Sequence, residues 1–359
     1  MPGVTAAAFS AAASDVALDA LFVPFHTGAL RLPADGRVLF LRARDGFALR
    51  EMAKPGWLCE QSFKPFADAL ERSRLSVGSP EPGAQFSLVL LLPPRQRDEA
   101  RALFARALSL TAPGGCVVAC MPNAEGGKSG ESDLARLVGS TGSLSKHKCR
   151  VFWTLPEASV VDASLCDTWL ALDMPRANAA GYLSRPGLFA WDRVDIASAL
   201  LAAHLPSDLA GRVADIGAGY GYLSAQLLAH CTGVTSLDLF EAEARALEPA
   251  RGNLEAALRE RASSVPVALH WHDVTSGLPG RYDVIVSNPP FHQGKADLPE
   301  LGRAFISAAA DALERDGRFW LVANRHLPYE AILAERFQEV RQVVLQDGFK
   351  VIEARGVRR

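Results

Sequence analysis

The chain has 359 residues, of which 49% are hydrophobic and 22% are charged, and its formal net charge is -2. This length gives room for two domains, each with its own hydrophobic core. The near-neutral charge means that a nucleic-acid partner cannot be inferred from composition and would need a local basic patch. No apolar run approaches the roughly 18–20 residues of a membrane-spanning helix.

The cysteines and the first thirty residues indicate a cytoplasmic protein. Six cysteines are scattered without a C-x-x-C pair, which is typical of reduced thiols and argues against a zinc site. The first thirty residues contain no lysine or arginine, so they lack the basic start of a signal peptide. We therefore expect no membrane segment and no bound metal.

The first half alternates between apolar strands and helices, which favours a parallel α/β sheet. The predicted strands cover residues 36–41, 57–60, 86–92 and 116–120. One helix is predicted to start after Gly46, and two others are predicted over 65–72 and 98–110.

Two further segments of this half are a predicted loop and a predicted linker. Residues 126–145 are rich in Gly and Ser and indicate a flexible loop, in which Lys128, and Lys148 just after it, would contact phosphate groups. A solvated loop without such a role is the alternative. Residues 159–185 carry scattered Pro, Gly, Asp and Asn, and we expect them to link a first domain (1–158) to a second (186–359).

A glycine-rich turn opens the second half. A helix is predicted over 195–205, and then a strand leads through Asp215 into Gly217-Ala218-Gly219 and a helix to about Cys231. Strand, glycine loop and helix form the nucleotide-binding unit of open α/β sheets. The G-x-G-x-G spacing differs from that of dinucleotide enzymes, which disfavours a nicotinamide dehydrogenase. An acidic residue before the glycines suits a cationic ligand better than a pyrophosphate.

The next two strands also end at acidic residues. The strand over 234–240 ends at Glu241, whose carboxylate can accept hydrogen bonds from both ribose hydroxyls of an adenosine, and Asp238 inside the strand is a competing candidate. The strand over 267–271 is followed by Asp273, placed to accept from an adenine amino group. The alternating His270 and His272 are interpreted as packed or solvated side chains rather than metal ligands, because no cysteine is close by.

The strand over 282–287 stops at Asn288-Pro289-Pro290-Phe291, because prolines cannot continue a hydrogen-bonded ladder. The Asn288 side-chain oxygen and a neighbouring backbone carbonyl can accept from a planar amino group, while Phe291 stacks on the ring that carries it. A plain strand end with a proline turn is the alternative. A helix over 301–313, a strand over 319–323, a helix over 330–337 and a hairpin over 340–353 complete a mostly parallel seven-stranded sheet.

The two halves align with each other. Residues 36–46 match 211–221 and residues 86–94 match 282–290. Four residues of the second half, namely Asp215, Gly217, Gly219 and Asn288, are replaced in the first half by Phe40, Arg42, Arg44 and Leu92. Arginines in a loop that needs glycine would block a ligand, so the first half is predicted to be a degenerate copy. Coincidence between two α/β halves is the alternative.

Taken in order, the glycine loop, Glu241, Asp273 and the Asn-Pro-Pro-Phe stretch resemble a class I S-adenosylmethionine-dependent methyltransferase. More narrowly, the chain is similar to the ribosomal RNA small subunit methyltransferase C family. That resemblance rests on four stretches: Pro186-Gly187-Leu188-Phe189 with Asp195, Asn288 to His292, Val322 to Tyr329, and Phe349-Lys350-Val351. It implies two tandem Rossmann-like methyltransferase folds with the first copy degenerate.

The resemblance also implies a function. The family methylates the exocyclic N2 amine of a guanine in 16S ribosomal RNA, with S-adenosyl-L-methionine as cofactor. We accordingly expect Asn288, Pro289, Pro290 and Phe291 to be catalytic. We expect Asp215, Gly217, Ala218, Gly219, Glu241, Asp273 and Asn288 to bind the cofactor, and Phe291, Arg325, Lys128 and Lys148 to bind RNA.

Several alternatives to this function stay open. The large-subunit guanine-N2 methyltransferase shares the stretch from Asn324 to Leu327, so the motifs do not decide between 16S and 23S RNA. Asn-Pro-Pro also serves adenine-N6 and protein glutamine methylation. A catalytically inactive RNA-binding or ribosome-assembly protein is an alternative of another class. We expect ribosomal RNA, within the small ribosomal subunit, as the partner, and a monomer or weak oligomer.

Overall fold

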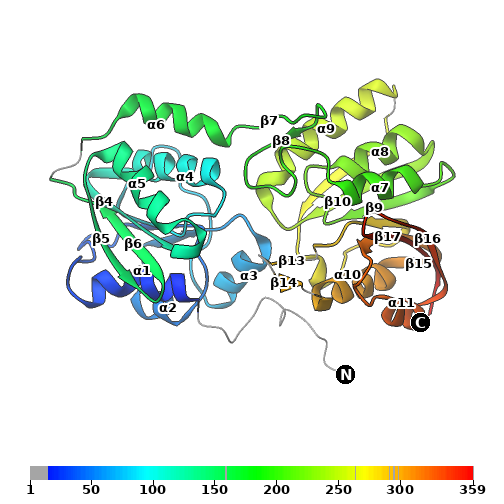
Figure 1. The fold of residues 1–359 in the computed structure, drawn as a ribbon, viewed down its shortest axis with the longest axis horizontal. Helices are drawn as coiled ribbons and strands as arrows, with labels where there is room; N and C mark the ends of the chain where they lie inside the picture. The colour runs from blue at the N-terminus through cyan, green and yellow to red at the C-terminus, as the bar shows by residue number, and fades with distance from the viewer. Residues whose placement is uncertain are drawn as a thin grey trace. The chain divides into compact units, whose positions relative to one another are not determined.

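The computed structural model describes residues 15–157, 160–262, 264–290, 292–293, 296–297 and 299–358, with only the backbone described for 292–293 and 296–297. The chain divides into two compact units, with the boundary between Met174 and Pro175. Each unit is an α/β layer structure in which helices flank one central sheet (Figure 1).

The first unit contains a six-stranded sheet of order β2-β1-β3-β4-β6-β5, in which the first four strands are parallel and β6 runs antiparallel to β4 and β5. Its strands are β1 (Val38–Leu41), β2 (Trp57–Glu60), β3 (Phe86–Leu91), β4 (Thr111–Pro122), β5 (Thr141–Lys146) and β6 (Cys149–Thr154). Its α-helices are α1 (Val16–His26), α2 (Phe47–Met52), α3 (Lys64–Arg72), α4 (Arg97–Ser109), α5 (Gly127–Val138) and α6 (Ala163–Leu170).

The second unit contains a seven-stranded sheet of order β11-β10-β9-β12-β15-β17-β16, parallel except for β17. Its strands are β9 (Ala210–Ile216), β10 (Gly233–Glu241), β11 (Val267–Trp271), β12 (Tyr282–Ser287), β15 (Leu313–Asn324), β16 (Phe337–Gln346) and β17 (Phe349–Val357). Its α-helices are α7 (Ile196–His204), α8 (Tyr222–His230), α9 (Leu247–Glu260), α10 (Pro299–Ala312) and α11 (Glu330–Arg336). Two short hairpins, β7 (Arg176–Ala177) with β8 (Leu183–Ser184) and β13 (His292–Gln293) with β14 (Ala296–Asp297), lie outside the sheet.

The central strands follow directly from their sequences. β12 lies between β9 and β15, and all but one of its residues are buried, as expected for a strand covered by helices on both faces. The strand ends where Pro289 removes a backbone donor. The buried β12 residue Ile285 packs with Phe305 and Ile306 of α10 in one hydrophobic cluster.

The predicted tandem α/β fold is confirmed, and the two sheets share the register that the internal alignment requires. In the first unit Val38 pairs with Leu88, and in the second unit their aligned counterparts Val213 and Val284 pair in the same parallel sense. This match in register favours an internal duplication over coincidence.

Two details differ from the predictions. The described part of the first sheet has six strands, because the counterpart of β11 is reduced to one bridge between Cys59 and Val77. The stretch after Val77 contains Gly78, Pro80 and Pro82, which interrupt a strand.

The second difference concerns residues 126–145, for which a flexible loop was the wrong prediction. They form α5 and most of β5. A Cβ at Gly130 would come within 2.4 Å of the Met121 sulfur and 3.2 Å of the Phe152 ring. The glycines therefore allow α5 to pack closely against the sheet.

Candidate active site

The predicted cofactor residues of the second unit lie at the carboxyl ends of neighbouring parallel strands. Asp215 is the next-to-last residue of β9, Glu241 ends β10, Asp273 follows β11 and Asn288 follows β12. The strand order reverses at β9, which lies between β10 and β12. Ligands of open α/β sheets bind at such a reversal point.

The glycine loop between β9 and α8 is fixed by backbone hydrogen bonds and has positive φ angles at its glycines. The amides of Gly217 and Ala218 both donate to the Phe240 carbonyl, at 2.9 and 3.2 Å. Gly217 has φ +75°, and a Cβ there would lie 3.3 Å from the Phe305 ring. Gly219 has φ +55° and open space at its Cβ position, with no described atom within 4 Å. The positive φ favours glycine at both positions, and Gly219 borders unfilled space.

Asp215 lies beneath this loop and is fully buried. Its Oδ2 accepts a hydrogen bond from Ser224 of α8 at 2.7 Å, whereas its Oδ1 has no partner among the described residues. Burial raises the pKa of Asp215 to about 7, and the Glu241 carboxylate adds to the rise. An orphaned buried carboxyl oxygen is the kind of atom that a bound ligand or a water molecule satisfies.

Glu241 is tied to the glycine loop. One carboxylate oxygen accepts from the Gly219 amide at 2.7 Å and the other from the Glu243 amide at 2.8 Å. Burial raises the pKa of Glu241. Both oxygens keep lone pairs for ribose hydroxyls. The competing Asp238 instead faces Tyr282 and His270, at 2.9 and 3.3 Å.

Asp273 caps the short 3₁₀ turn Val274–Ser276, and its Oδ1 accepts from the amide and hydroxyl of Thr275 at 2.9 and 2.7 Å. Its position after β11 is the one predicted for an adenine contact. The orphaned Asp215 oxygen, the open Gly219 and the anchored Glu241 together fit a nucleoside cofactor that carries a positive charge.

Asn288 is partly buried, and its side-chain nitrogen is bonded twice. Nδ2 donates to Asp195 Oδ2 at 3.0 Å and to Ser198 Oγ at 2.8 Å. The sequence prediction missed both partners. Asp195-Ile196-Ala197-Ser198 aligns with Asp15-Val16-Ala17-Leu18 of the first copy, where leucine replaces the serine.

The other predicted residues are placed as follows. Pro289 is buried and Pro290 is exposed, whereas Phe291 lies outside the described residues. Arg325 is exposed just after β15, the strand next to β12, so it lies at the same sheet edge as Asn288. Two further cations, Lys128 on α5 and Lys148 in the β5–β6 turn, are exposed residues of the first unit.

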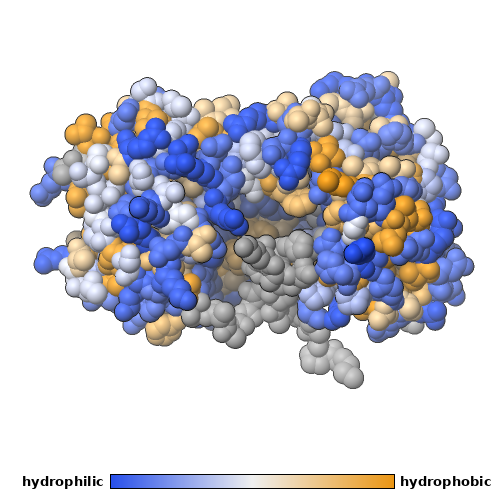
Figure 2. Space-filling view, in the orientation of Figure 1, coloured by the Kyte–Doolittle hydropathy of each residue, from blue (hydrophilic) through white to orange (hydrophobic). Residues whose placement is uncertain are grey.

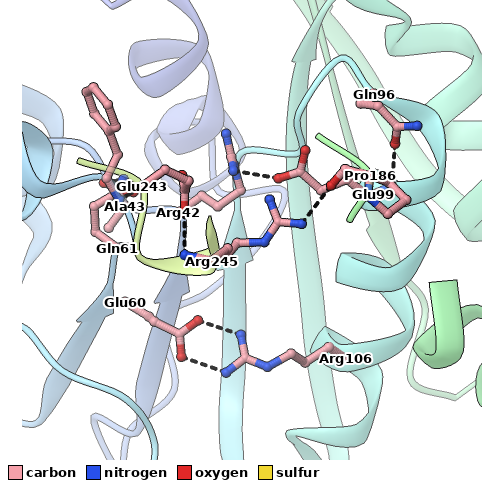
Figure 3. A network of polar contacts seen from close by, with 11 residues as sticks. Arg42, Ala43, Glu60, Gln61, Gln96, Glu99, Arg106, Pro186, Glu243 and Arg245 are labelled. Atoms are coloured by element: carbon pink, nitrogen blue, oxygen red, sulfur yellow. Dashed lines mark hydrogen bonds and ion pairs between the residues drawn. The ribbon is translucent and has the colours of Figure 1, made fainter. Parts of the chain in front are cut away.

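The aligned loop of the first unit carries two arginines that pair with carboxylates, and Figure 3 shows Arg42 with Glu99. Arg42, the counterpart of Gly217, keeps a positive φ of 54° and extends its guanidinium to Glu99 at 2.8 Å. Arg44, the counterpart of Gly219, pairs with Asp15 at 2.9 Å. The loop backbone is matched at Arg42 only. Gly219 and Gly221 have φ +55° and +82°, whereas Arg44 has no positive φ and Gly46 has φ -179°.

Gln61 is the structural counterpart of Glu241. Its Oε1 accepts from the amide two residues on, Phe63, at 2.9 Å, as Glu241 accepts from Glu243. Its Nε2 donates to the Ala43 carbonyl of the loop at 2.6 Å, so the amide is bonded at both ends within the protein. The sequence prediction did not identify this correspondence.

The described residues contain no group of three or more His, Cys, Asp or Glu side chains arranged to hold a metal ion. Across the same residues, no helix is long and apolar enough to cross a bilayer. The face of the molecule shown in Figure 2 is mostly hydrophilic, with small separate hydrophobic patches.

The strand order, the glycine loop and the Asn-Pro-Pro turn define a methyltransferase of the Rossmann-like class. A family model described as "Methyltransferase small domain" matches residues 180–353. The chain also has the fold of the T. thermophilus 16S rRNA N2 methyltransferase RsmC, solved in complex with AdoMet and guanosine. That likeness has a TM-score of 0.73 and 23% identity, and covers 95% of this chain and 92% of the other.

Curated relatives give the family. The Ribosomal RNA small subunit methyltransferase C of Citrobacter koseri is 31% identical over 78% of this chain and 79% of its own length. The Ribosomal RNA large subunit methyltransferase G of Ectopseudomonas mendocina is 33% identical over 78% of this chain and 74% of its own length. The chain belongs to the ribosomal RNA small subunit methyltransferase C family.

Proposed function

We propose that the protein transfers a methyl group from S-adenosylmethionine to the exocyclic N2 amine of a guanine in 16S ribosomal RNA. One observation carries the proposal: the amine-accepting turn is attached directly to the cofactor loop. Ser287 Oγ donates to the Ile216 carbonyl at 2.8 Å, and the Asn288 carbonyl oxygen lies 3.9 Å from the Cβ position of Gly217. The names of the family's members support the same reaction.

The chemistry of the amine explains the residues. An exocyclic guanine amine is a poor nucleophile because its lone pair is delocalised into the ring. Hydrogen bonds from the amine to the Asn288 side-chain oxygen and the Pro289 carbonyl would favour a pyramidal nitrogen with a localised lone pair. Phe291 would stack on the base, which must leave its helix or loop at a cost of a few kcal/mol.

The cofactor, when bound, supplies a methyl group that its sulfonium charge has already activated. The protein then has to hold the amine in line with that group, and positioning of this kind accounts for a large part of many rate enhancements. The Glu241 carboxylate would hold the ribose, and Asp273 the adenine amino group. No covalent enzyme intermediate is needed.

Replacement of Asn288 tests the mechanism. We expect Asn288→Ala to fold and still to bind S-adenosylmethionine, while kcat falls by about 100-fold or more because a positioned transition-state contact is lost. Methyl transfer would be followed with a labelled cofactor, and cofactor binding by calorimetry. Wild-type turnover in this variant would contradict the proposal.

The substrate is tested by methylating unmodified 16S and 23S RNA in parallel, as naked RNA and as ribosomal subunits. We expect N2-methylguanosine in nucleoside digests of 16S RNA. The 33% identity to a large-subunit enzyme makes 23S RNA the second candidate. If neither RNA gains the nucleoside, the ribosomal assignment fails, and adenine-N6 and glutamine substrates become the next to test.

The first unit, in this proposal, supports folding of the second and contacts RNA through exposed cations such as Lys128 and Lys148. The protein would work in the cytoplasm on the small ribosomal subunit.

Replacing both lysines with glutamine should raise the KM for RNA and leave cofactor affinity unchanged. A second unit that works normally on its own would contradict the role given to the first.

A further inference from the structure

The Asn288 side chain has two chemically different ends, and only one of them suits the proposed reaction. The carbonyl end accepts a hydrogen bond from an amine, whereas the NH₂ end would oppose the hydrogens of that amine. Rotation of the carboxamide by 180° exchanges the two ends with little change in shape. Some feature of the protein must therefore determine which end faces the substrate.

Asp195 and Ser198, at the start of α7, lie against the NH₂ end. Asp195 Oδ2 is 3.0 Å and Ser198 Oγ is 2.8 Å from Asn288 Nδ2, so both amide hydrogens have acceptors. A carboxylate can only accept, and it therefore selects the nitrogen rather than the oxygen. Among the described residues, none donates to Asn288 Oδ1, which leaves that oxygen for the substrate.

Asp195 is itself held in place. The same Oδ2 accepts from the Ser198 amide at 2.8 Å, which makes Asp195 the N-cap of α7. Ser198 is buried, with 9% of its surface exposed. A capped helix start is a rigid support, so the two acceptors are fixed before any substrate arrives.

The first copy of the fold gives an independent comparison. It keeps the capping residue, since Asp15 accepts from the Leu18 amide at 3.1 Å. Leucines occupy the positions of the serine and the asparagine: Leu18 aligns with Ser198, and Leu92 aligns with Asn288. These two leucines belong to one hydrophobic cluster. The cap is thus part of the fold, whereas serine and asparagine occur only where the amide is used.

From this geometry we infer that Asp195 and Ser198 are positioning residues that fix the orientation of the Asn288 carboxamide, so that its oxygen faces the amine. The inference rests on the proposed function for the identity of the amine. It assigns a purpose in the reaction to the start of α7, in addition to its structural role as a helix cap.

The test uses three variants of the full chain. Asp195→Gly removes the carboxylate, and glycine costs a helix cap only a few tenths of a kcal/mol. Ser198→Ala removes the second acceptor. Asp195→Asn keeps an oxygen that can accept from Asn288 and should recover most of the loss. Asp15→Gly removes the matching cap in the first unit and serves as the control.

We expect kcat to fall about tenfold or more in Asp195→Gly and several-fold in Ser198→Ala, because a loosened reacting group loses its alignment. The S-adenosylmethionine Kd should stay within about threefold of the wild-type value. Asp15→Gly should keep wild-type kcat. Equal kcat in Asp195→Gly and wild type, or equal losses in Asp195→Gly and Asp15→Gly, would overturn the inference.

A readout that needs no activity separates this inference from the proposed function. In ¹⁵N spectra, the side-chain NH₂ of Asn288 should exchange slowly in the wild type and faster in Asp195→Gly and Ser198→Ala. If the wild type does not methylate guanine but shows this protection pattern, only the proposed function has failed. If the wild type is active and the NH₂ exchanges equally fast in all variants, the positioning role has failed.

Discussion

At the scale of single residues, the buried carboxyl of Asp215 links cofactor binding to pH. Its pKa is raised to about 7 by burial, so much of the free protein carries a neutral Asp215 below that pH. A cationic cofactor favours the carboxylate, and below pH 7 binding must therefore release a proton. This consequence can be measured.

We expect the Kd for S-adenosylmethionine to fall by up to about tenfold per pH unit between pH 5.5 and 7, and to level off above about pH 8. Asp215→Asn, which cannot titrate, should bind more weakly at pH 8 and show no such slope. Calorimetry in two buffers of different ionisation enthalpy would count the protons released. A wild-type Kd that is constant from pH 5.5 to 8 would contradict this prediction.

Residue types and their order were enough to predict which side chains meet at the sheet edge. Asp215, Glu241 and Asn288 each follow an apolar run, and parallel strands bring such ends together. The contacts of Asn288 with Asp195 and Ser198 were not predicted, because they join segments about ninety residues apart through the packing of α7. Periodicity within one segment carries no information about such a contact.

At the scale of elements, the glycine loop after β9 makes a specific prediction about Gly219. Gly219→Arg introduces the residue type that the first copy carries at this position, Arg44. The backbone cost should be about 1–2 kcal/mol, since φ is positive. We expect cofactor affinity to fall at least 100-fold, because the side chain would fill the open space in front of the loop.

Gly28→Arg is the matched control for that change. Gly28 also has a positive φ, +77°, and open space at its Cβ position, but it lies in a turn after α1. It should lower the melting temperature about as much as Gly219→Arg does and leave the cofactor Kd unchanged. Equal effects of the two substitutions on binding would show that Gly219 does not face the ligand.

The elements themselves were largely predictable, and α5 shows why some were not. Glycine lowers helix propensity, so a Gly-rich sequence predicts a loop. In the folded protein, a Cβ at Gly127 would crowd Met121 and Arg150, and a Cβ at Gly130 would collide with Met121 and crowd Phe152. Close packing of the helix therefore outweighs the low helix propensity of glycine. Tertiary constraints of this kind are absent from a local pattern. β12, in contrast, is recognisable because burial on both faces leaves an uninterrupted apolar run.

At the scale of the whole molecule, two copies of one fold keep one framework but differ in the residues of their loops. The first copy retains strand order and register, but Arg42, paired with Glu99, and Arg44 replace the glycines of the cofactor loop. We therefore expect titration calorimetry to give one S-adenosylmethionine bound per chain. Glu241→Ala should remove that single event and leave no residual binding. A stoichiometry near two would contradict the occupied first site.

The loop in the first copy has a consequence for the energetics of the second. It shares two bonds with the second copy: the Ala43 amide donates to the Glu60 carbonyl as Ala218 does to Phe240, and Gln61 accepts from Phe63 as Glu241 does from Glu243. The second copy adds the bonds from the Gly217 amide to Phe240 and from the Gly219 amide to Glu241. These bonds within the protein pre-organise its cofactor loop, and little conformational entropy is lost when the ligand docks. The heat-capacity change of binding should then reflect the buried surface of the nucleoside alone, without the larger change that accompanies coupled folding.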